Sequence, residues 1–299
     1  MTVLIWLGLA MVALVVVAIL LRVVGANRWA ALMRTHTGLL EAGRADSAGV
    51  AGDGAPFAAR YDAREIEDLP APVQHYFRAV LRDGQPIIAA ATIEMVGQIN
   101  MSATAEQWKA FTSHQRVVTT AAGSRPGFLW NAQVAMLPGV PALVEDSYIA
   151  GRGQLTAKLL GLFTVAEAGG GGEPARGEFM RYFAETVWYP TALLPSQGVQ
   201  WQAVDDQSAN ATLVDGPIGL SLLFRFNQAG LIASVRAESR GAGVGKDMVM
   251  LPWECTLSDY QPHDGMLVAM TGEVAWIRPE GRKSYFVGHI KQLRYDYLP

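Results

Sequence analysis

An uninterrupted apolar run dominates the start of the hydrophobic pattern. No charged side chain occurs from Thr2 to Leu21, and the run consists almost wholly of Val, Leu, Ile, Ala and Met. A helix of this length, rising ~1.5 Å per residue, spans the ~30 Å hydrocarbon core of a bilayer with all its backbone hydrogen bonds internal. The pattern predicts a transmembrane anchor over residues 1–22, in which residues 2–21 contact the lipid bilayer.

A cleaved signal peptide is the alternative for this segment, because residues 24–26 (Val-Gly-Ala) form a small-residue cleavage pattern. The run has no Lys or Arg before it and exceeds the ~7–15 apolar residues usual in a signal peptide, which favours a retained anchor. Arg22, Arg28 and Arg34 all follow the run. The positive-inside rule then predicts a single-pass protein whose C-terminal part is cytoplasmic, and a periplasmic location stays open.

Residues 23–60 change first to a mixed and then to a small and polar composition. Apolar residues such as Trp29, Met33 and Leu40 recur among polar ones between positions 28 and 41, a spacing typical of a short amphipathic helix beside the membrane. Ala, Gly, Ser and Asp dominate residues 43–59, which indicates a flexible tether. A single folded domain is therefore predicted over residues 61–299.

Two helices are predicted in this domain. The first begins at the prolines of residues 69–72, carries an apolar stripe at helical spacing and ends before Gly84. The second covers residues 178–188 and ends because Pro190 pushes its predecessor out of the helical region. Four consecutive glycines, Gly169–Gly172, predict a surface turn before the second helix.

From residue 91 onward, most of the remaining chain alternates between apolar and polar positions with a period of two. Ile93 and Met95 flank Glu94, and Leu220 to Phe226 places its large apolar residues on one face. Turn signals recur every ~8–12 residues, as in antiparallel sheets that curl. The predicted fold class is α+β and mostly antiparallel β: a transmembrane helix, then a curved half-barrel or barrel-like sheet with two packing helices.

Composition and charge exclude several classes of function. The chain is 51% apolar and 17% charged, which excludes a disordered protein, and its formal net charge of -3 argues against a nucleic-acid partner. The single cysteine, Cys255, permits no intramolecular disulfide and is predicted to be a small buried hydrophobe. The histidines are too widely spaced for short zinc motifs, so no metal or cofactor is predicted. Residues 241–246 resemble a phosphate loop, but Arg240 and Asp247 break its pattern, and a hairpin is predicted there.

The stretch 181–195 is the densest group of candidate site residues. Arg181 and Glu185 lie four residues apart, so their side chains meet on one helix face. They can form the polar floor of an apolar pocket with tryptophan walls, or the helix can plug the barrel while the tryptophans fill its core. The candidate ligand-binding residues are Trp130, Asp146, Tyr148, Arg181, Glu185, Trp188 and Trp253, with Trp201 and Trp276 as further wall residues.

Four motifs together resemble a known family. They are Leu69-Pro70-x-Pro72-Val73-Gln74-x-Tyr76-Phe77, Pro126-Gly127-Phe128-x-Trp130-x-Ala132, Asp146-x-Tyr148-x-x-Gly151-x-Gly153, and the stretch from Arg181 to Pro195. Over roughly Leu69 to Tyr297 the chain resembles an uncharacterised bacterial family of membrane-anchored proteins with a domain of unknown function. The resemblance implies a bacterial inner-membrane location but no established activity. The pattern of elements is also similar, at the level of fold, to lipoprotein-carrier half-barrels, which hold acyl chains.

These observations favour a membrane-anchored protein that binds a lipid-like or other hydrophobic ligand in the concavity of a curved sheet. One alternative is a hydrolase-like enzyme that uses Glu185 with Asp146 or Asp259, which requires these carboxylates to converge. A further alternative is a scaffold for a membrane protein partner, which requires a contiguous exposed apolar patch.

Overall fold

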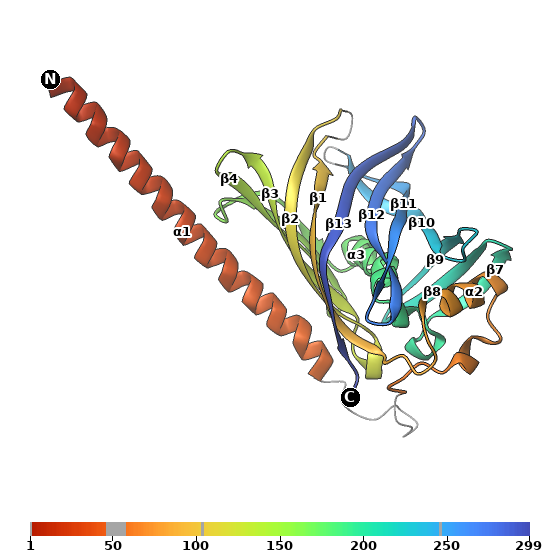
Figure 1. Ribbon diagram of the computed structural model, residues 1–299. Helices are drawn as coiled ribbons and strands as arrows, with labels where there is room; N and C mark the ends of the chain where they lie inside the picture. Colours follow the sequence, from red (N-terminus) through yellow and green to blue (C-terminus); the bar gives the residue numbers. More distant parts are fainter. Residues whose placement is uncertain (1, 46–57, 103–104, 245–246) are drawn as a thin grey trace.

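The computed structural model describes residues 2–45, 58–102, 105–244 and 247–299, and within them the chain forms one antiparallel sheet of 13 strands with three α-helices (Figure 1). The helices are α1 (Thr2–Ala45), α2 (Ala71–Val80) and α3 (Glu173–Ala184), with short 3-10 helices η1 (Ala63–Ile66), η2 (Ala121–Gly123), η3 (Glu185–Trp188), η4 (Pro190–Leu193) and η5 (Pro195–Gln197). The strands are β1 (Ile88–Asn100), β2 (Trp108–Val118), β3 (Gly127–Leu137), β4 (Val140–Ile149), β5 (Arg152–Leu159), β6 (Phe163–Gly170), β7 (Gln200–Asp205), β8 (Ser208–Asp215), β9 (Ile218–Phe226), β10 (Ile232–Val244), β11 (Asp247–His263), β12 (Met266–Arg278) and β13 (Gly281–Tyr297).

Helix α1 is a single rod of 44 residues. By length and composition it can cross a membrane, and its apolar N-terminal half projects away from the sheet (Figure 1). The amphipathic helix predicted at 28–41 is therefore not a separate element, because it continues the apolar helix without a break. The predicted tether begins too early, since residues 43–45 are helical, and most of it lies outside the described residues.

The strand order places the first and last strands side by side in the middle of the sheet. The order is β6-β5-β4-β3-β2-β1-β13-β12-β11-β10-β9-β8-β7, so β6 and β7 are the two edges and the sheet is not closed. All neighbouring strands are antiparallel, and the predicted fold class is confirmed. Because β6 and β7 are consecutive in the chain but lie at opposite edges, the connection between them crosses the concave face, and α3 forms most of that crossing (Figure 1).

Local irregularities in the strand pairing accompany the curvature. Register shifts occur at Glu94/Met95 in the β1–β13 pair and at Val274/Ala275 in the β12–β13 pair, and such bulges increase the twist of a sheet. Gly97 and Gly288 are register partners in the central pair. A Cβ on Gly97 would collide with a carbonyl oxygen of β13, so the sheet bends where only glycine fits.

The two predicted packing helices are present, with corrected bounds for the second. Helix α3 begins at Glu173 rather than 178, because Pro174 is tolerated in a first turn, and it tightens into a 3-10 helix at Glu185. Gly169 and Gly170 belong to the end of β6, so the predicted glycine turn is wrong for these two and limited to residues 171–172. Strand pairing with β5 fixes both glycines there despite their low strand propensity.

The hydrophobic core fills the half of the concavity nearest to α2. Tyr148 stacks on Phe179 of α3 with ring centroids 5.0 Å apart, and Phe183 contacts Phe224 at 5.8 Å. Trp201 packs between Phe77 and Phe224, away from the other half of the concavity. Helix α3 therefore plugs one half of the half-barrel and leaves the other half for a cavity.

Candidate functional site

An apolar cavity of about 510 Å³ lies on the concave side of the sheet beside α3 and η3. This volume falls in the range of ~300–1,000 Å³ usual for small-molecule sites. Its walls are mostly aliphatic and aromatic side chains, which come from strands β1, β3, β4, β5, β6, β11, β12 and β13. The apolar wall residues are Ile99, Met101, Trp130, Val134, Met136, Ala142, Val144, Leu155, Ala157, Leu159, Val165, Ala166, Ala184, Trp188, Trp253, Cys255, Val274 and Phe286.

Arg181 is the centre of the polar floor of this cavity. Its Nε donates to Oε1 of Glu185 at 2.8 Å, and its Nη1 donates to Oδ2 of Asp146 on β4 at 2.5 Å. Gln115 on β2 closes the network, because its Oε1 accepts from Nη2 of Arg181 at 3.2 Å and its Nε2 donates to Oε2 of Glu185 at 2.6 Å. The guanidinium also lies over the ring of Trp130, with Cζ 5.0 Å from the centroid. Both carboxylates are thus held as acceptors of one fixed cation.

The electrostatic environment of Arg181 is that of a buried ion network. Its side chain is 15% exposed, and those of Asp146 and Glu185 are 12% and 10% exposed. Burial by itself lowers the pKa of Arg181, but the charges of Glu185 and Asp146 outweigh this effect and raise that pKa above its usual value. Arg181 therefore stays charged, and the network is one that is costly to break.

A second group, Glu178 and Arg240, adjoins this floor. Arg240 on β10 lies 3.5 Å from Glu178 through Nη2 and Oε1, and its Cζ lies 4.7 Å from the ring centroid of Trp253. Oε2 of Glu178 and Oδ1 of Asp146 are both buried, and among the described residues neither accepts a hydrogen bond from a donor. Burial first, and then the charge of Asp146, raise the pKa of Glu178 well above its ordinary value. Glu178 therefore holds its proton more tightly than an exposed glutamate does.

Six of the seven candidate ligand-binding residues predicted from the sequence line the cavity: Trp130, Asp146, Arg181, Glu185, Trp188 and Trp253. Tyr148 does not, because α3 covers it completely and its hydroxyl donates to Oδ2 of Asp215 at 2.6 Å. The predicted wall residues Trp201 and Trp276 are also absent from the lining. Trp201 lies in the core, and Trp276 stacks on Tyr285 with centroids 5.8 Å apart.

The carboxylate pair of Glu185 with Asp259 is not assembled. Asp259 is exposed on β11 and accepts from Nε2 of Gln261 at 3.0 Å. Glu185 and Asp146 do converge, but Arg181 bridges them. Burial also raises the pKa of the Cys255 thiol to about 12, so this wall residue stays protonated and is no nucleophile. Among the described residues, no cluster of three His, Cys, Asp or Glu side chains is arranged to hold a metal.

Three polar residues of this network were missed from the sequence: Gln115, Glu178 and Arg240. Glu178 precedes Arg181 by three positions, so its place on the same helix face was a usable signal. Arg240 gave no such signal, because the pairing of β10 with β11 is irregular between Ala237 and Arg240, and strict alternation does not predict its direction.

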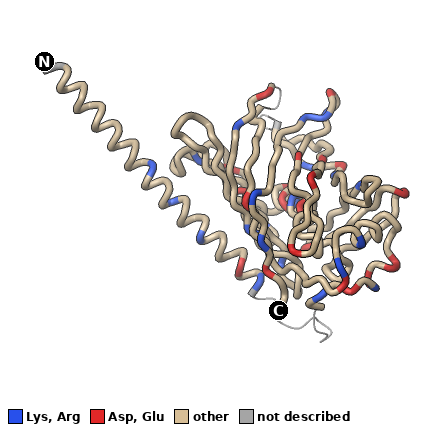
Figure 2. Tube along the Cα trace, in the orientation of Figure 1, with Lys and Arg blue, Asp and Glu red and all other residues tan. Residues whose placement is uncertain are grey.

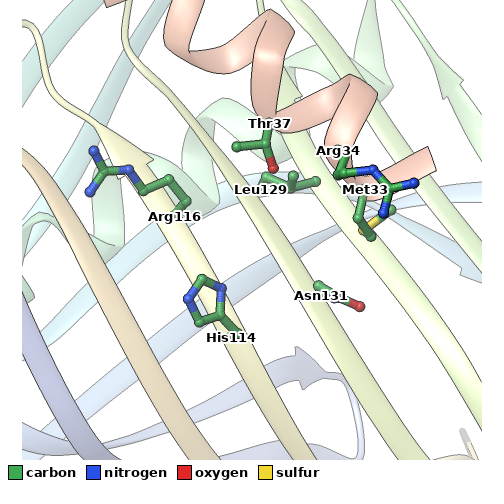
Figure 3. Close-up of a pocket in the computed structure, with 7 residues that line it drawn as sticks. All are labelled: Met33, Arg34, Thr37, His114, Arg116, Leu129 and Asn131. Carbon is green, nitrogen blue, oxygen red and sulfur yellow. The ribbon is translucent and has the colours of Figure 1, made fainter. Parts of the chain in front are cut away.

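A second hollow, of about 350 Å³, lies on the other side of the sheet, between α1 and the convex face of β2 and β3 (Figure 3). Met33, Arg34 and Thr37 of the helix face His114, Arg116, Leu129 and Asn131 of the strands. Neighbouring side chains already hold the helix to the sheet: Nε1 of Trp29 donates to Oδ1 of Asn131 at 2.9 Å. This hollow is part of the helix–sheet contact, so the concave cavity is the better candidate site.

Fold and site together define the class: a half-open antiparallel sheet wrapped around a crossing helix, with an apolar cavity above a charge-balanced floor. The chain belongs to DUF6920, a family of unknown function whose model matches residues 67–295. The resemblance found in the sequence motifs is thereby confirmed. No curated protein matches the chain in sequence.

Solved structures resemble the chain only distantly. A LolA superfamily protein from Nitrosomonas europaea has 8% identity and a TM-score of 0.38, over 70% of this chain and 87% of the other. A porin-like protein from Bacteroides uniformis has 6% identity and a TM-score of 0.24, over 71% and 96%. A β-barrel-like protein of the domain of unknown function DUF1849 from Brucella abortus has 11% identity and a TM-score of 0.22, over 73% and 100%.

Proposed function

We propose that this protein binds a lipid-like or other hydrophobic ligand in the concave cavity while α1 anchors it in a bacterial inner membrane. The observation that carries the proposal is the cavity itself, whose walls are almost wholly apolar. Each methylene group moved from water into such a site contributes about 0.8 kcal/mol. Binding is therefore expected to strengthen with chain length until the cavity is full.

The floor of the cavity narrows the class of ligand. Both cations of the floor already have carboxylate partners, because Arg181 donates to Asp146 and Glu185, and Arg240 lies 3.5 Å from Glu178. A buried ligand charge would therefore have to displace a protein group from this network. The ligand part inside the cavity is therefore an uncharged acyl or comparable apolar group.

Trp188 contributes one polar group, its indole N–H, to the apolar wall. Its Nε1 is buried and has no hydrogen-bond partner among the described residues. An ester or carbonyl oxygen of a ligand can accept from it, which would satisfy an otherwise costly buried donor. This favours an acylated molecule over a plain hydrocarbon.

Retention of α1 as an anchor is supported by the packing around residue 25. The small-residue segment 24–26 is helical, and a Cβ on Gly25 would collide with the carbonyl oxygen of Leu160 in the β5–β6 turn. Cleavage after residue 26 would remove this contact of the β5–β6 turn, so the close packing favours a retained segment. The basic residues after the apolar half support a cytoplasmic location for the domain of residues 61–299. A reporter enzyme that is active on one side of the membrane only, fused after Pro299, tests this location.

The ligand is tested on the full chain purified from bacterial membranes in a mild detergent. Mass spectrometry of the bound fraction should show an acyl lipid retained through extensive washing. Ala157→Phe, which fills the cavity from β5, should lose most of it. Ala135→Phe, the same change on the convex face of β3, should retain it. Equal lipid in both variants, or none in the unaltered protein, would refute the proposal.

A further inference from the structure

Exposed apolar side chains gather at the end of the sheet formed by the β3–β4 and β5–β6 turns. Leu137 at the end of β3 is 67% exposed, and Phe163 and Val165 at the start of β6 are each 56% exposed. We call these three residues the lip. Side chains of this size at a water-exposed strand end mark a contact surface when they lie together beside another apolar surface.

The lip lies next to the point where the apolar half of α1 ends. A Cβ on Gly139, in the β3–β4 turn, would lie 3.7 Å from Nη1 of Arg22, the first charged residue after the apolar run. In the β5–β6 turn, Leu160 and Gly161 contact Gly25, less than one helical turn further on. Both turns of the lip therefore sit at the level where the helix passes from its apolar to its polar half.

The contact between α1 and the sheet is extensive enough to fix this arrangement. Trp29 and Met33 are buried against Leu129 and Leu143 of the convex face. Nδ1 of His36 lies 2.5 Å from Oε1 of the fully buried Glu145. Further along, Nε of Arg116 donates to Oε1 of Glu41 at 2.6 Å. The sheet thus cannot swing away from the axis of α1 without breaking a buried interface.

The distribution of charge also favours contact between the lip end of the molecule and a membrane. Basic residues follow the apolar half along α1 (Figure 2), at the level where the anionic headgroups of a bacterial membrane would lie when α1 spans the bilayer. The opposite end of the sheet, where α2 packs, carries the acidic segment 62–68 with four carboxylates. Arginines at positions 60, 64, 78 and 82 offset most of this acidic charge, so an anionic membrane attracts the first end more strongly than the second.

From these observations we infer that the lip inserts into the interface of the bilayer that α1 spans, so that the cavity opens onto the membrane. The inference rests on the proposed anchoring by α1. Val165 belongs both to the lip and to the cavity wall, and Met136 and Leu159 line the cavity beside Leu137 and the β5–β6 turn. An acyl chain therefore has a continuous apolar path from the bilayer to the cavity and never has to cross water.

The test measures how deep the lip lies in a membrane. Single cysteines are placed at Leu137→Cys and Phe163→Cys in full-length protein carrying Cys255→Ala, and each is labelled with an environment-sensitive fluorophore. The protein is reconstituted into vesicles of phosphatidylethanolamine and phosphatidylglycerol that contain a doxyl-labelled phosphatidylcholine quencher. Leu14→Cys, in the apolar half of α1, is the positive control. Val204→Cys is the matched negative control, a 50% exposed valine on β7, the opposite edge strand.

Probes at positions 137 and 163 should shift to the blue and lose about half or more of their emission, as expected for side chains ~5–10 Å inside the interface. The probe at position 204 should be unaffected. If the probe at position 14 is quenched but the probes at 137 and 163 are quenched no more than the probe at 204, the lip does not insert into the membrane and the inference is refuted. If position 14 is also unquenched, α1 does not span the vesicle membrane, and both anchor and lip are overturned.

Failure of the lip is distinguishable from failure of ligand binding. Neither Leu137 nor Phe163 lines the cavity, so labelling them leaves its walls intact. If lipid is retained in the cavity but the lip probes are not quenched, only the insertion of the lip is refuted. Quenched lip probes together with an empty cavity would support the lip and refute the ligand.

Discussion

Replacing Arg181 by methionine is the sharpest test of the cavity floor. The substitution keeps a long flexible side chain but removes the cation that binds Asp146 and Glu185. Both carboxylates are about nine-tenths buried, so they are left without compensation in a site poor in water. Removing one partner from a buried ion pair typically costs ~3–5 kcal/mol. The lost contact over Trp130 adds to this by an amount of the order of 0.5–2 kcal/mol.

Urea unfolding of the full chain in detergent, followed by tryptophan fluorescence, measures this loss. With a slope of ~1–3 kcal/mol per molar urea, Arg181→Met should lower the unfolding midpoint by about 1 M or more. The matched control is Arg176→Met on the same helix, whose ion pair with Glu173 is 3.1 Å long and about one-third exposed. An exposed pair contributes only ~0–1 kcal/mol, so this variant should change little.

Neutralising the acceptors separates the charge effect from simple loss of packing. Adding Asp146→Asn and Glu185→Gln to Arg181→Met removes the uncompensated charges and should restore most of the stability, because neutral groups of similar shape replace the whole network. If Arg181→Met costs no more than Arg176→Met, the floor is solvated and does not exclude a charged ligand group. If the triple variant is as unstable as Arg181→Met, packing and not charge explains the loss.

Three further predictions follow from other parts of the structure. Because the pKa of Glu178 is raised above its ordinary 4.5, the folded protein keeps a proton that the unfolded chain loses. Relative to the unaltered protein, Glu178→Gln should therefore gain about 1.4 kcal/mol of stability per pH unit as the pH rises from 4.5 towards the raised pKa. Equal pH profiles of the two proteins in urea titrations would contradict this. Gly25→Ala should loosen the contact of α1 with the β5–β6 turn and expose Trp29 to an aqueous fluorescence quencher. The control Gly38→Ala, with open space around residue 38, should leave Trp29 protected and stabilise the helix by up to about 1 kcal/mol. Trp188→Phe should keep the fold but weaken binding of an acyl ester about tenfold, because one hydrogen bond of ~1–1.5 kcal/mol is lost. In the same equilibrium titrations, binding of a plain alkane should be unchanged.

Patterns within one element were readable from the sequence, and relations between distant elements were not. The Arg181–Glu185 pair follows from helical spacing alone, and the period of two predicts that Trp130 and Val134 share a face. Tyr148 has the same periodicity as Asp146, two residues earlier, but only one of them reaches the cavity. The difference depends on where α3 crosses the sheet, and no local pattern contains that information.

The docking of α1 was missed for a related reason. Its contacts to the sheet pair residues about a hundred positions apart, such as Trp29 with Asn131 and His36 with Glu145. The segment looked like an isolated amphipathic helix followed by a tether, because its polar residues gave no sign of specific partners. Helix and sheet are instead held together by a small buried cluster and several ion pairs.

The topology itself explains why the cavity has a charged floor and apolar walls. Since β1 and β13 pair in the middle, the sheet grows outward in both directions, and its edges β6 and β7 are joined across the concave face (Figure 1). The crossing helix buries one side on the core and must turn its other side, with Glu178, Arg181 and Glu185, towards the remaining space. Those charges require partners from the sheet, which Asp146, Gln115 and Arg240 supply. The floor is thus tied to folding, whereas wall residues on β5, β6, β11 and β12 are free to vary. Substitutions in the walls should therefore change which acyl length binds best at little cost in stability, and substitutions in the floor should cost stability before they change specificity.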